Sequence, residues 1–208
     1  MGTAVENEFK FTSDRRIDED TVVDELLSYL DKKGITYSVK VKSSVDRYYD
    51  SEHLALYHND CMLRLKNSEN GKIKLTMKRP ISNAKQMMSR KEIERASDGS
   101  FEDVCAFCRT EFPDLIISPE PTLMIECERT SIDLKDGSGI KLSFDHCVYR
   151  YGIDSKDFYE IEYESMDDIT NTEFDNIGIC GFIQFYLEFQ PVVKSKYQRG
   201  IEWRNDSI

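Results

Sequence analysis

Apolar and polar residues alternate along much of the chain, which is typical of strands with one face in a core. In residues 72–80, for example, Ile73, Leu75 and Met77 share one side, and lysines occupy positions between them. Aromatic and β-branched residues are frequent in the same segments, as they are in strands generally. The predicted strands cover residues 5–11, 35–51, 61–67, 72–80, 87–96, 122–134, 140–152 and 158–165.

Helical spacing of apolar residues occurs between some of these strands. Residues 18–34 begin with acidic side chains, carry an apolar stripe from Val23 to Leu30 and end at Gly34. Acidic residues at the start and glycine at the end are typical of a helix. The other segments predicted as helical, or as a short helix or turn in the last case, are 101–112, 171–191 and 194–203.

The number and order of these elements predict an α+β fold. A polar turn at residues 68–71 joins two strands as a hairpin. About eight such strands favour an eight-stranded antiparallel β-barrel with helices packed outside. No internal repeat or linker divides the sequence, so we expect a single domain over residues 1–208.

The polar face of most predicted strands is ionic. It carries both signs of charge, as in Glu6, Glu8 and Lys10 of the first strand. Such a face fits either a sheet with one side in water or the lining of a closed lumen, and alternation does not distinguish them. The corresponding residues on later strands are Arg64, Lys66, Lys72, Lys74, Lys78, Arg90, Glu92, Glu94, Lys141, Asp145, Glu160, Glu162 and Glu164.

Composition excludes several classes of protein. A net charge of -11 argues against a general binder of nucleic acids or membrane surfaces. No stretch approaches the roughly 18 apolar residues of a membrane helix, and the start lacks signal-peptide features, so we expect a cytoplasmic protein. Among six cysteines, Cys105 and Cys108 lie on the apolar stripe of a predicted helix, which favours packing over a zinc or redox site.

Short motifs occur in a distinctive order along the chain. The first, ENEFK at residues 6–10, places Glu6, Glu8 and Lys10 on one face of a strand. It is followed by DRYYDSEHLALYHNDCMLRLK (46–66), KIKLTMK (72–78), SRKEIE (89–94), ECER (126–129), LSFDH (142–146), YEIEYE (159–164) and KSK (194–196). Each motif alone is weak, but together, over residues 6–196, they resemble the CYTH superfamily of triphosphate tunnel metalloenzymes.

The resemblance implies an antiparallel tunnel that hydrolyses or cyclises a triphosphate with Mg2+ or Mn2+ as cofactor. The catalytic residues would be Glu6, Glu8, Lys10 and Glu162. The metal ligands would be Glu6, Glu8, Asp145, Glu160 and Glu162. The substrate-binding residues would be Arg64, Lys66, Lys74, Lys78, Arg90, Arg129 and Lys196. The chain departs from the family at Cys127, where a lysine is common two residues before the arginine.

The chemistry of triphosphates matches this set of residues. Arginine and lysine neutralise phosphate oxygens with charge-assisted hydrogen bonds, and carboxylates are the ligands that Mg2+ and Mn2+ prefer. We expect hydrolysis of inorganic triphosphate, because the sequence shows no pocket for adenine or thiamine. The alternatives are hydrolysis of thiamine triphosphate or a nucleotide, cyclic AMP formation as in class IV adenylate cyclases, and non-catalytic binding of polyphosphate or nucleotide. The expected partner is a triphosphate-containing small molecule, without nucleic acid or membrane.

Overall fold

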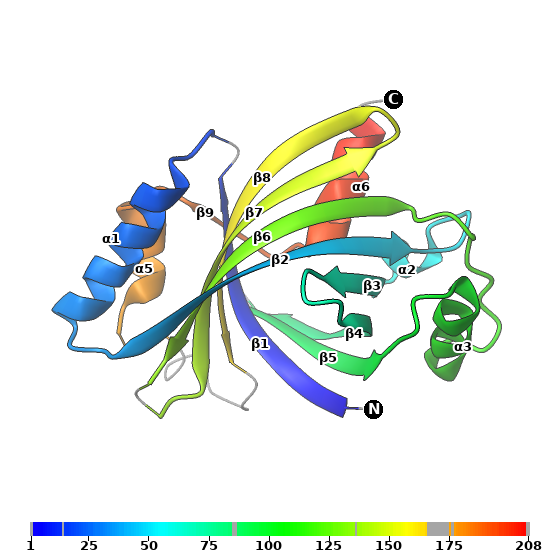
Figure 1. The fold of residues 1–208 in the computed structure, drawn as a ribbon, viewed down its shortest axis with the longest axis horizontal. Coiled ribbons are helices and arrows are strands. Elements are labelled where there is room, and N and C mark those ends of the chain that lie inside the picture. The colour runs from blue at the N-terminus through cyan, green and yellow to red at the C-terminus, as the bar shows by residue number, and fades with distance from the viewer. Residues whose placement is uncertain are drawn as a thin grey trace.

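The computed structural model of the chain describes residues 2–13, 15–84, 87–135, 137–165, 175 and 177–206, with the backbone alone described at 82–84. Within these residues the strands form one antiparallel sheet (Figure 1). The strands are β1 (Gly2–Ser13), β2 (Tyr37–Tyr49), β3 (Met62–Ser68), β4 (Ile73–Ala84), β5 (Met87–Ala96), β6 (Leu123–Leu134), β7 (Ile140–Tyr151), β8 (Asp154–Ser165) and β9 (Gln190–Val192).

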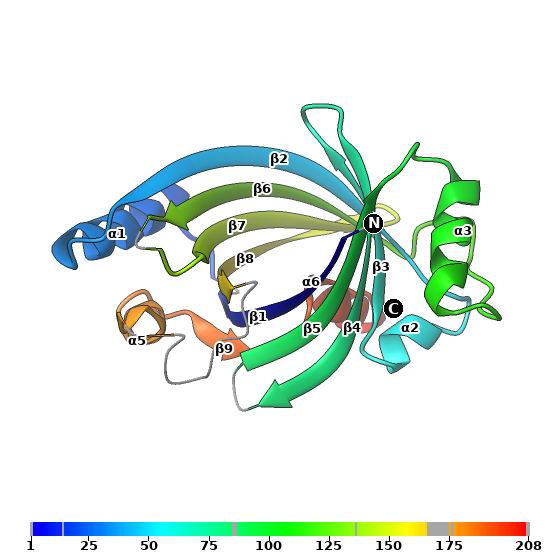
Figure 2. The same ribbon diagram turned by 90° about the horizontal axis from the view of Figure 1, so that it is seen from below.

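The sheet closes into a barrel because β1 pairs with a strand on each side. Its residues 2–9 pair with β5, and its residues 7–13 pair with β8. The ring runs β5-β4-β3-β2-β6-β7-β8-β1, and β9 is added to β1. Figure 2 shows β2, β6 and β7 on one side of the ring and β1, β5 and β4 on the other. The predicted eight-stranded antiparallel barrel is confirmed.

Helices pack around the barrel. They are α1 (Glu19–Lys32), α2 (Ala55–His58), α3 (Phe101–Glu111), α5 (Ile179–Phe185) and α6 (Lys196–Asp206). On one side of the barrel α1 and α5 lie next to each other (Figure 1), where Leu26 and Ile183 pack with outward-facing Phe11 of β1. On another side, Val104 and Phe107 of α3 pack with the apolar faces of β3, β4 and β5. The outer faces of the strands thus form the apolar layers that the alternation predicts.

The helix predicted at residues 171–191 is wrong at its C-terminal end. Of this segment, residues 171–174 and 176 lie outside the described residues, and α5 ends at Phe185. The chain then forms β9, which pairs with β1 through Pro191 and its neighbours. Proline has no amide hydrogen to extend a helix, but it is tolerated in an edge strand.

The last helix, α6, lies across one end of the barrel. Its residues Tyr197 and Ile201 pack with Tyr48 of β2 and Leu123 of β6. At Gly200 an added Cβ would lie 2.2 Å from Leu123 Cδ2, so the close approach of α6 to β6 requires a glycine. The segment 194–203, predicted as a short helix or turn, therefore contributes to a longer helix that covers an opening of the barrel.

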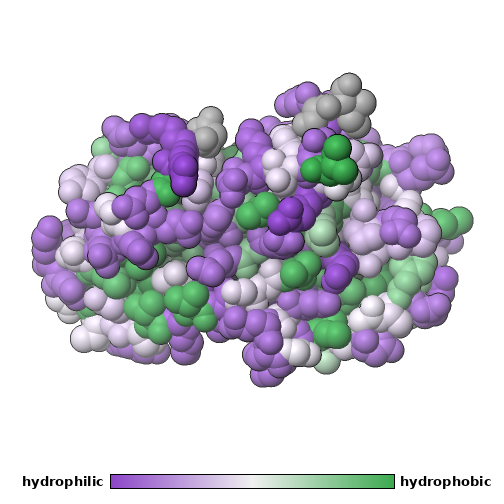
Figure 3. Space-filling view, turned by 45° about the horizontal axis from the view of Figure 1, so that its top comes forward, coloured by the Kyte–Doolittle hydropathy of each residue, from purple (hydrophilic) through white to green (hydrophobic). Residues whose placement is uncertain are grey.

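Hydrophilic side chains spread over the molecular face in Figure 3, with apolar residues in separate groups among them. None of the helices in the described residues has the length and hydrophobicity that a membrane span requires.

Candidate functional site

The charged faces of the strands point into the barrel. Glu6, Glu8 and Lys10 are each at most 5% exposed, although side chains of this kind are rarely buried without partners. Alternation along β1 directs Phe9 and Phe11 toward the outer apolar layer and these ionic side chains toward the bore. The ionic faces therefore line a lumen, which the alternation alone left open.

A cavity of about 260 Å³ occupies the bore. Cationic side chains outnumber acidic ones in its lining by eight to six, although the whole chain carries a net charge of -11. The interior is therefore the part of the protein suited to an anion. The cavity is lined by the following residues predicted for the site: Glu6, Glu8, Lys10, Arg64, Lys66, Lys78, Arg90, Arg129, Glu162 and Lys196.

A second cavity, of about 390 Å³, adjoins the first. Lys74, which was predicted to bind substrate, lines this second cavity and forms an ion pair with Glu94. The two cavities share the lining residues Arg64, Lys66, Arg129, Lys141 and Glu164. The predicted cations therefore lie along one continuous space.

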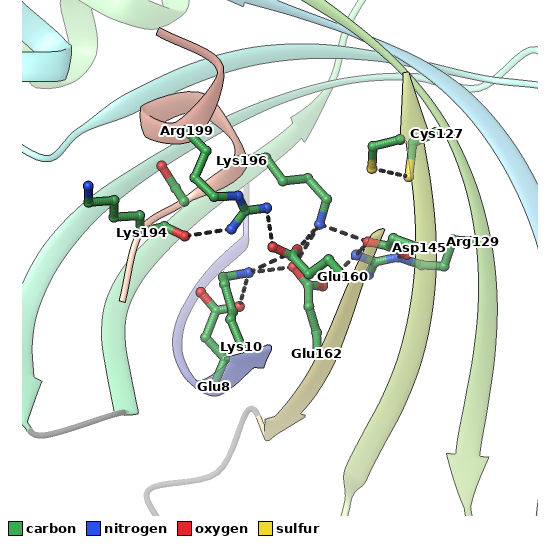
Figure 4. A network of polar contacts seen from close by, with 12 residues as sticks. Glu8, Lys10, Cys127, Arg129, Asp145, Glu160, Glu162, Lys194, Lys196 and Arg199 are labelled. Carbon is green, nitrogen blue, oxygen red and sulfur yellow. Dashed lines mark hydrogen bonds and ion pairs between the residues drawn. The ribbon is translucent and has the colours of Figure 1, made fainter. Parts of the chain in front are cut away.

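Asp145 and Glu160, predicted as metal ligands, lie behind the wall of this space and are at most 1% exposed. Arg129 donates two hydrogen bonds to Asp145, from Nε over 2.7 Å and from a terminal nitrogen over 2.6 Å. Lys196 and Arg199 of α6 both form ion pairs with Glu160 (Figure 4). The Lys196 ammonium also lies 2.7 Å from Asp145, so cations of the protein itself already neutralise both buried carboxylates.

The same cations keep the buried carboxylates ionised. Burial alone would raise the pKa of Asp145, but Arg129 and Lys196 hold it below its usual range. Glu162 is also buried, and Arg129 with Lys10 and Lys196 holds its pKa well below the ordinary value. Removing one of these cations would leave the buried carboxylates only partly neutralised, which is destabilising.

A second group of carboxylates, from Glu6, Glu8 and Glu164, is directed into the bore. One oxygen of each lies within 4.8 Å of the other two. Burial, together with the charges of Glu162 and Glu6, raises the pKa of Glu164 to about 7. Lys78 pairs with Glu6, and Lys10 lies 2.8 Å from Glu8, but Glu164 forms no ion pair within the described part of the chain.

This second group fits a divalent cation. An ion among the three carboxylates would offset both burial and the repulsion from neighbouring carboxylates, which together raise the pKa of Glu164. Its oxygen ligands suit Mg2+ or Mn2+, which bind few carboxylates and keep several waters. The group of Asp145, Glu160 and Glu162 also has oxygens within 4.8 Å of one another, but Lys196 contacts all three of these residues. It fits a metal less well, because a metal there would compete with an ammonium group.

Two lysines complement the unpaired carboxylate. Lys66 and Lys141 form no ion pair with any residue that the structure describes, and both line the region shared by the two cavities. Burial and the neighbouring Arg64 and Arg129 lower the pKa of Lys66. A bound anion would offset this repulsion. The bore thus places two lysines that have no ion pair in the described part of the chain beside a cluster of carboxylates.

Other ion pairs position the remaining cations. Asp46 of β2 accepts a hydrogen bond from Arg64 over 3.1 Å, and Glu92 of β5 lies 2.9 Å from the Lys78 ammonium. Glu92, Lys141 and Glu164 lie on the charged faces that alternation predicts, but the sequence indicated no role for them.

Asp46 and Arg199 were not among the site residues predicted from the sequence. Asp46 lies on the same face of β2 as Ser44 and Tyr48, two residues away on either side, which could have indicated its inward direction. Arg199 follows Lys196 by three residues, the spacing that puts two side chains on one face of a helix.

Comparisons with known proteins agree with this geometry. Residues 6–178 match the family model of the CYTH domain. No curated protein sequence matches the chain. Among solved structures, a Hippeastrum protein described as an adenylyl cyclase with a dominant triphosphatase activity has a TM-score of 0.64 and 15% identity, over 95% of this chain and 96% of that one.

Two further structures have the same fold. A protein from Pyrococcus horikoshii has a TM-score of 0.59 and 18% identity, over 95% of this chain and 99% of its own. A Bacillus halodurans protein, assigned as an adenylate cyclase, has a TM-score of 0.55 and 16% identity, over 96% and 98% of the two chains. At these identities the likeness concerns the fold.

Proposed function

The chain belongs to the CYTH family, and we propose that its bore hydrolyses inorganic triphosphate with Mg2+ or Mn2+. The main support for the proposal is the position of Lys66 and Lys141, which have no ion pair among the described residues, beside the carboxylates of Glu6, Glu8 and Glu164. Cations without partners favour a polyanion, and a nearby group of carboxylates favours the divalent ion that accompanies it.

Glu6, Glu8 and Glu164 would hold the metal ion, with Glu162 next to them in the same lining. When bound, such an ion supplies charge neutralisation at phosphate oxygens and lowers the pKa of a coordinated water. Lys10 contacts both Glu8 and Glu162, and Lys78 contacts Glu6. These lysines therefore fix the directions of the carboxylates before any ligand binds.

Arg64, Lys66, Arg129 and Lys141 would bind the phosphate oxygens. Asp46 holds Arg64, and Asp145 holds Arg129 through two hydrogen bonds, so both guanidinium groups are fixed in direction. Fixed cations stabilise charge that spreads over a phosphoryl group during transfer, because they need no rearrangement at that moment. Lys74, Arg90 and Lys196 remain predicted contacts at the edges of this set.

The lining of the bore favours phosphate over a nucleotide base or thiamine. Tyr48 is an aromatic residue in the lining, but its ring stacks on Tyr197 with centroids 5.3 Å apart and planes 8° apart. It is 1% exposed and offers no free face to a base. Cys127 also lines the bore as an uncharged group in the position where the family resemblance implied lysine. Phosphate contacts would therefore depend mainly on the four cations that line both cavities, Arg64, Lys66, Arg129 and Lys141.

Phosphate release from tripolyphosphate, measured with and without Mg2+ or Mn2+, tests the proposal. We expect Glu8→Gln to lower kcat by about 10²- to 10³-fold, which is typical when one transition-state electrostatic partner is removed. Glu128→Gln is the matched control, because Glu128 is an exposed residue of β6 that does not line the bore cavity. Metal-dependent release that survives Glu8→Gln would exclude this site. Tight binding of tripolyphosphate without release by the unchanged protein would identify a binding module instead.

A further inference from the structure

Two cysteines face each other in the wall of the bore. Cys127 of β6 and Cys147 of β7 are directly opposite partners in the antiparallel register. The Cys147 thiol donates a hydrogen bond to Cys127 Sγ, with the sulfurs 3.3 Å apart (Figure 4 shows the contact at Cys127). Neither cysteine has a role in the proposed hydrolysis, so the pair requires an explanation of its own.

The backbone geometry of the pair is compatible with a disulfide. Directly opposite residues of antiparallel strands have Cα atoms about 4.5 to 5.5 Å apart. This interval lies inside the roughly 4.4 to 6.8 Å found between disulfide-bonded cysteines. From 3.3 Å, the sulfurs need to approach by a little more than about 1 Å to reach bonding distance. Rotation of the side chains can supply most of this movement.

Access to the pair comes from the bore. Cys127 lines the cavity and is 8% exposed, whereas Cys147 is 1% exposed. A small oxidant that enters the bore therefore meets Cys127 first. Asp145 also lies within 4.8 Å of the two sulfurs, but its oxygens are engaged by Arg129 and Lys196. The surroundings therefore favour dithiol chemistry over a metal site at this position.

We propose that Cys127 and Cys147 are a modification site that peroxide oxidises reversibly to an intramolecular disulfide. In the first step, Cys127 sulfur attacks one oxygen of hydrogen peroxide, the O–O bond breaks, and Cys127 sulfenic acid and one water form. In the second step, Cys147 sulfur attacks the sulfenic sulfur, the S–S bond forms, and a second water leaves. The two thiols lose two electrons and two protons in total, and the peroxide is reduced to two waters.

The disulfide would join β6 and β7 next to the cations of the bore. Arg129 and Asp145 are the next inward-facing pair on the same two strands and are also directly opposite. The modification therefore lies one pair away from a guanidinium group that the proposed function assigns to phosphate. The chemistry itself does not depend on that assignment.

Peptide mapping under non-reducing conditions tests the proposal. The folded, reduced protein is treated with hydrogen peroxide, its remaining thiols are alkylated, and it is digested with trypsin. Cys127 and Cys147 fall in separate tryptic peptides, residues 110–129 and 142–150, each with one cysteine. We expect these two peptides to be cross-linked after peroxide, with the loss of two hydrogen atoms, and to separate after dithiothreitol.

Two variants test whether the cross-link is specific to Cys127 and Cys147. Cys147→Ser should remove the cross-link and leave Cys127 as a sulfenic acid that dimedone traps. The Cys105→Ser/Cys108→Ser double variant, with both changes on α3, should keep the cross-link. The proposal is overturned if peroxide leaves both thiols free for alkylation, if Cys127 is recovered only as sulfinic or sulfonic acid, or if the cross-link joins other cysteines. Peptide mapping of the protein without substitutions tests the proposed disulfide even if a variant fails to fold.

Discussion

The Lys66→Met substitution tests whether the cations of the bore have two different roles. Some would bind the ligand, and others stabilise the barrel. Lys66 lines both cavities and has no ion pair among the described residues, whereas Arg129 forms ion pairs with Asp145 and Glu162. Methionine keeps most of the length of the lysine stem and removes only the charge. The substitution should therefore weaken binding of tripolyphosphate without weakening the fold.

The expected magnitudes follow from these contacts. One hydrogen bond to a charged group contributes about 1.5 to 3 kcal/mol, so loss of the Lys66 contact should raise Kd for tripolyphosphate by about 10- to 150-fold. The free energy of unfolding should change by less than about 1 kcal/mol, because no partner is left unpaired. Arg129→Met, in contrast, should lower the free energy of unfolding by up to about 3 to 5 kcal/mol, since Asp145 and Glu162 each lose one of their buried partners.

Calorimetric titration with tripolyphosphate and urea unfolding of the ligand-free protein measure the two quantities. Lys91→Met provides the control for loss of one positive charge, because Lys91 is 43% exposed and does not line either cavity. It should change Kd by less than about 3-fold, since solvent and salt screen a distant charge. The reasoning is refuted if Lys66→Met binds as tightly as the Lys91 control, or if it destabilises the fold as much as Arg129→Met.

Two further substitutions test the division of roles and the packing of α6. Arg64→Ala should weaken tripolyphosphate binding by about 10-fold or more while leaving Mn2+ affinity nearly unchanged, because Arg64 pairs with Asp46 and, among the described residues, forms no ion pair with the carboxylates of the metal group. Calorimetry that gives the reverse order would contradict this. Gly200→Ala should lower the free energy of unfolding by about 1 to 3 kcal/mol, because the added methyl group overlaps Leu123 at 2.2 Å. An unchanged urea midpoint would show that α6 does not depend on this close approach.

Alternation along the strands was sufficient to predict most of the barrel. The spacing of Ile73, Leu75 and Met77 requires an apolar layer on one side of β4, and α3 with its neighbours supplies that layer. Alternation could not show that the opposite side is enclosed. Enclosure depends on the pairing of β1 with β5, in which Glu6 lies opposite Arg90. Such long-range pairing leaves no local sequence signal, so only the order of motifs indicated it.

Local sequence patterns also could not predict how deep along the bore each residue lies. Glu160, Glu162 and Glu164 have the same inward direction on β8, but their surroundings differ. Glu160 meets Lys196 and Arg199, and Glu164 lies toward the second cavity without an ion pair in the described residues. The placement of α6 across the barrel end creates this difference. The sequence therefore identified the inward residues but could not divide them into buried anchors and candidate ligands.

The relative kcat/KM for tripolyphosphate, ATP and thiamine triphosphate, measured under the same Mg2+ and Mn2+ concentrations, tests the central claim most directly. The described residues that line the bore present cations to phosphate and no free aromatic face to a base, because Tyr48 is stacked on Tyr197. Binding energy from a base or thiamine raises the rate only if a pocket holds that group in the transition state. We therefore predict the highest value for tripolyphosphate. A higher kcat/KM for ATP or thiamine triphosphate, or the absence of metal-dependent release from all three, would contradict the account.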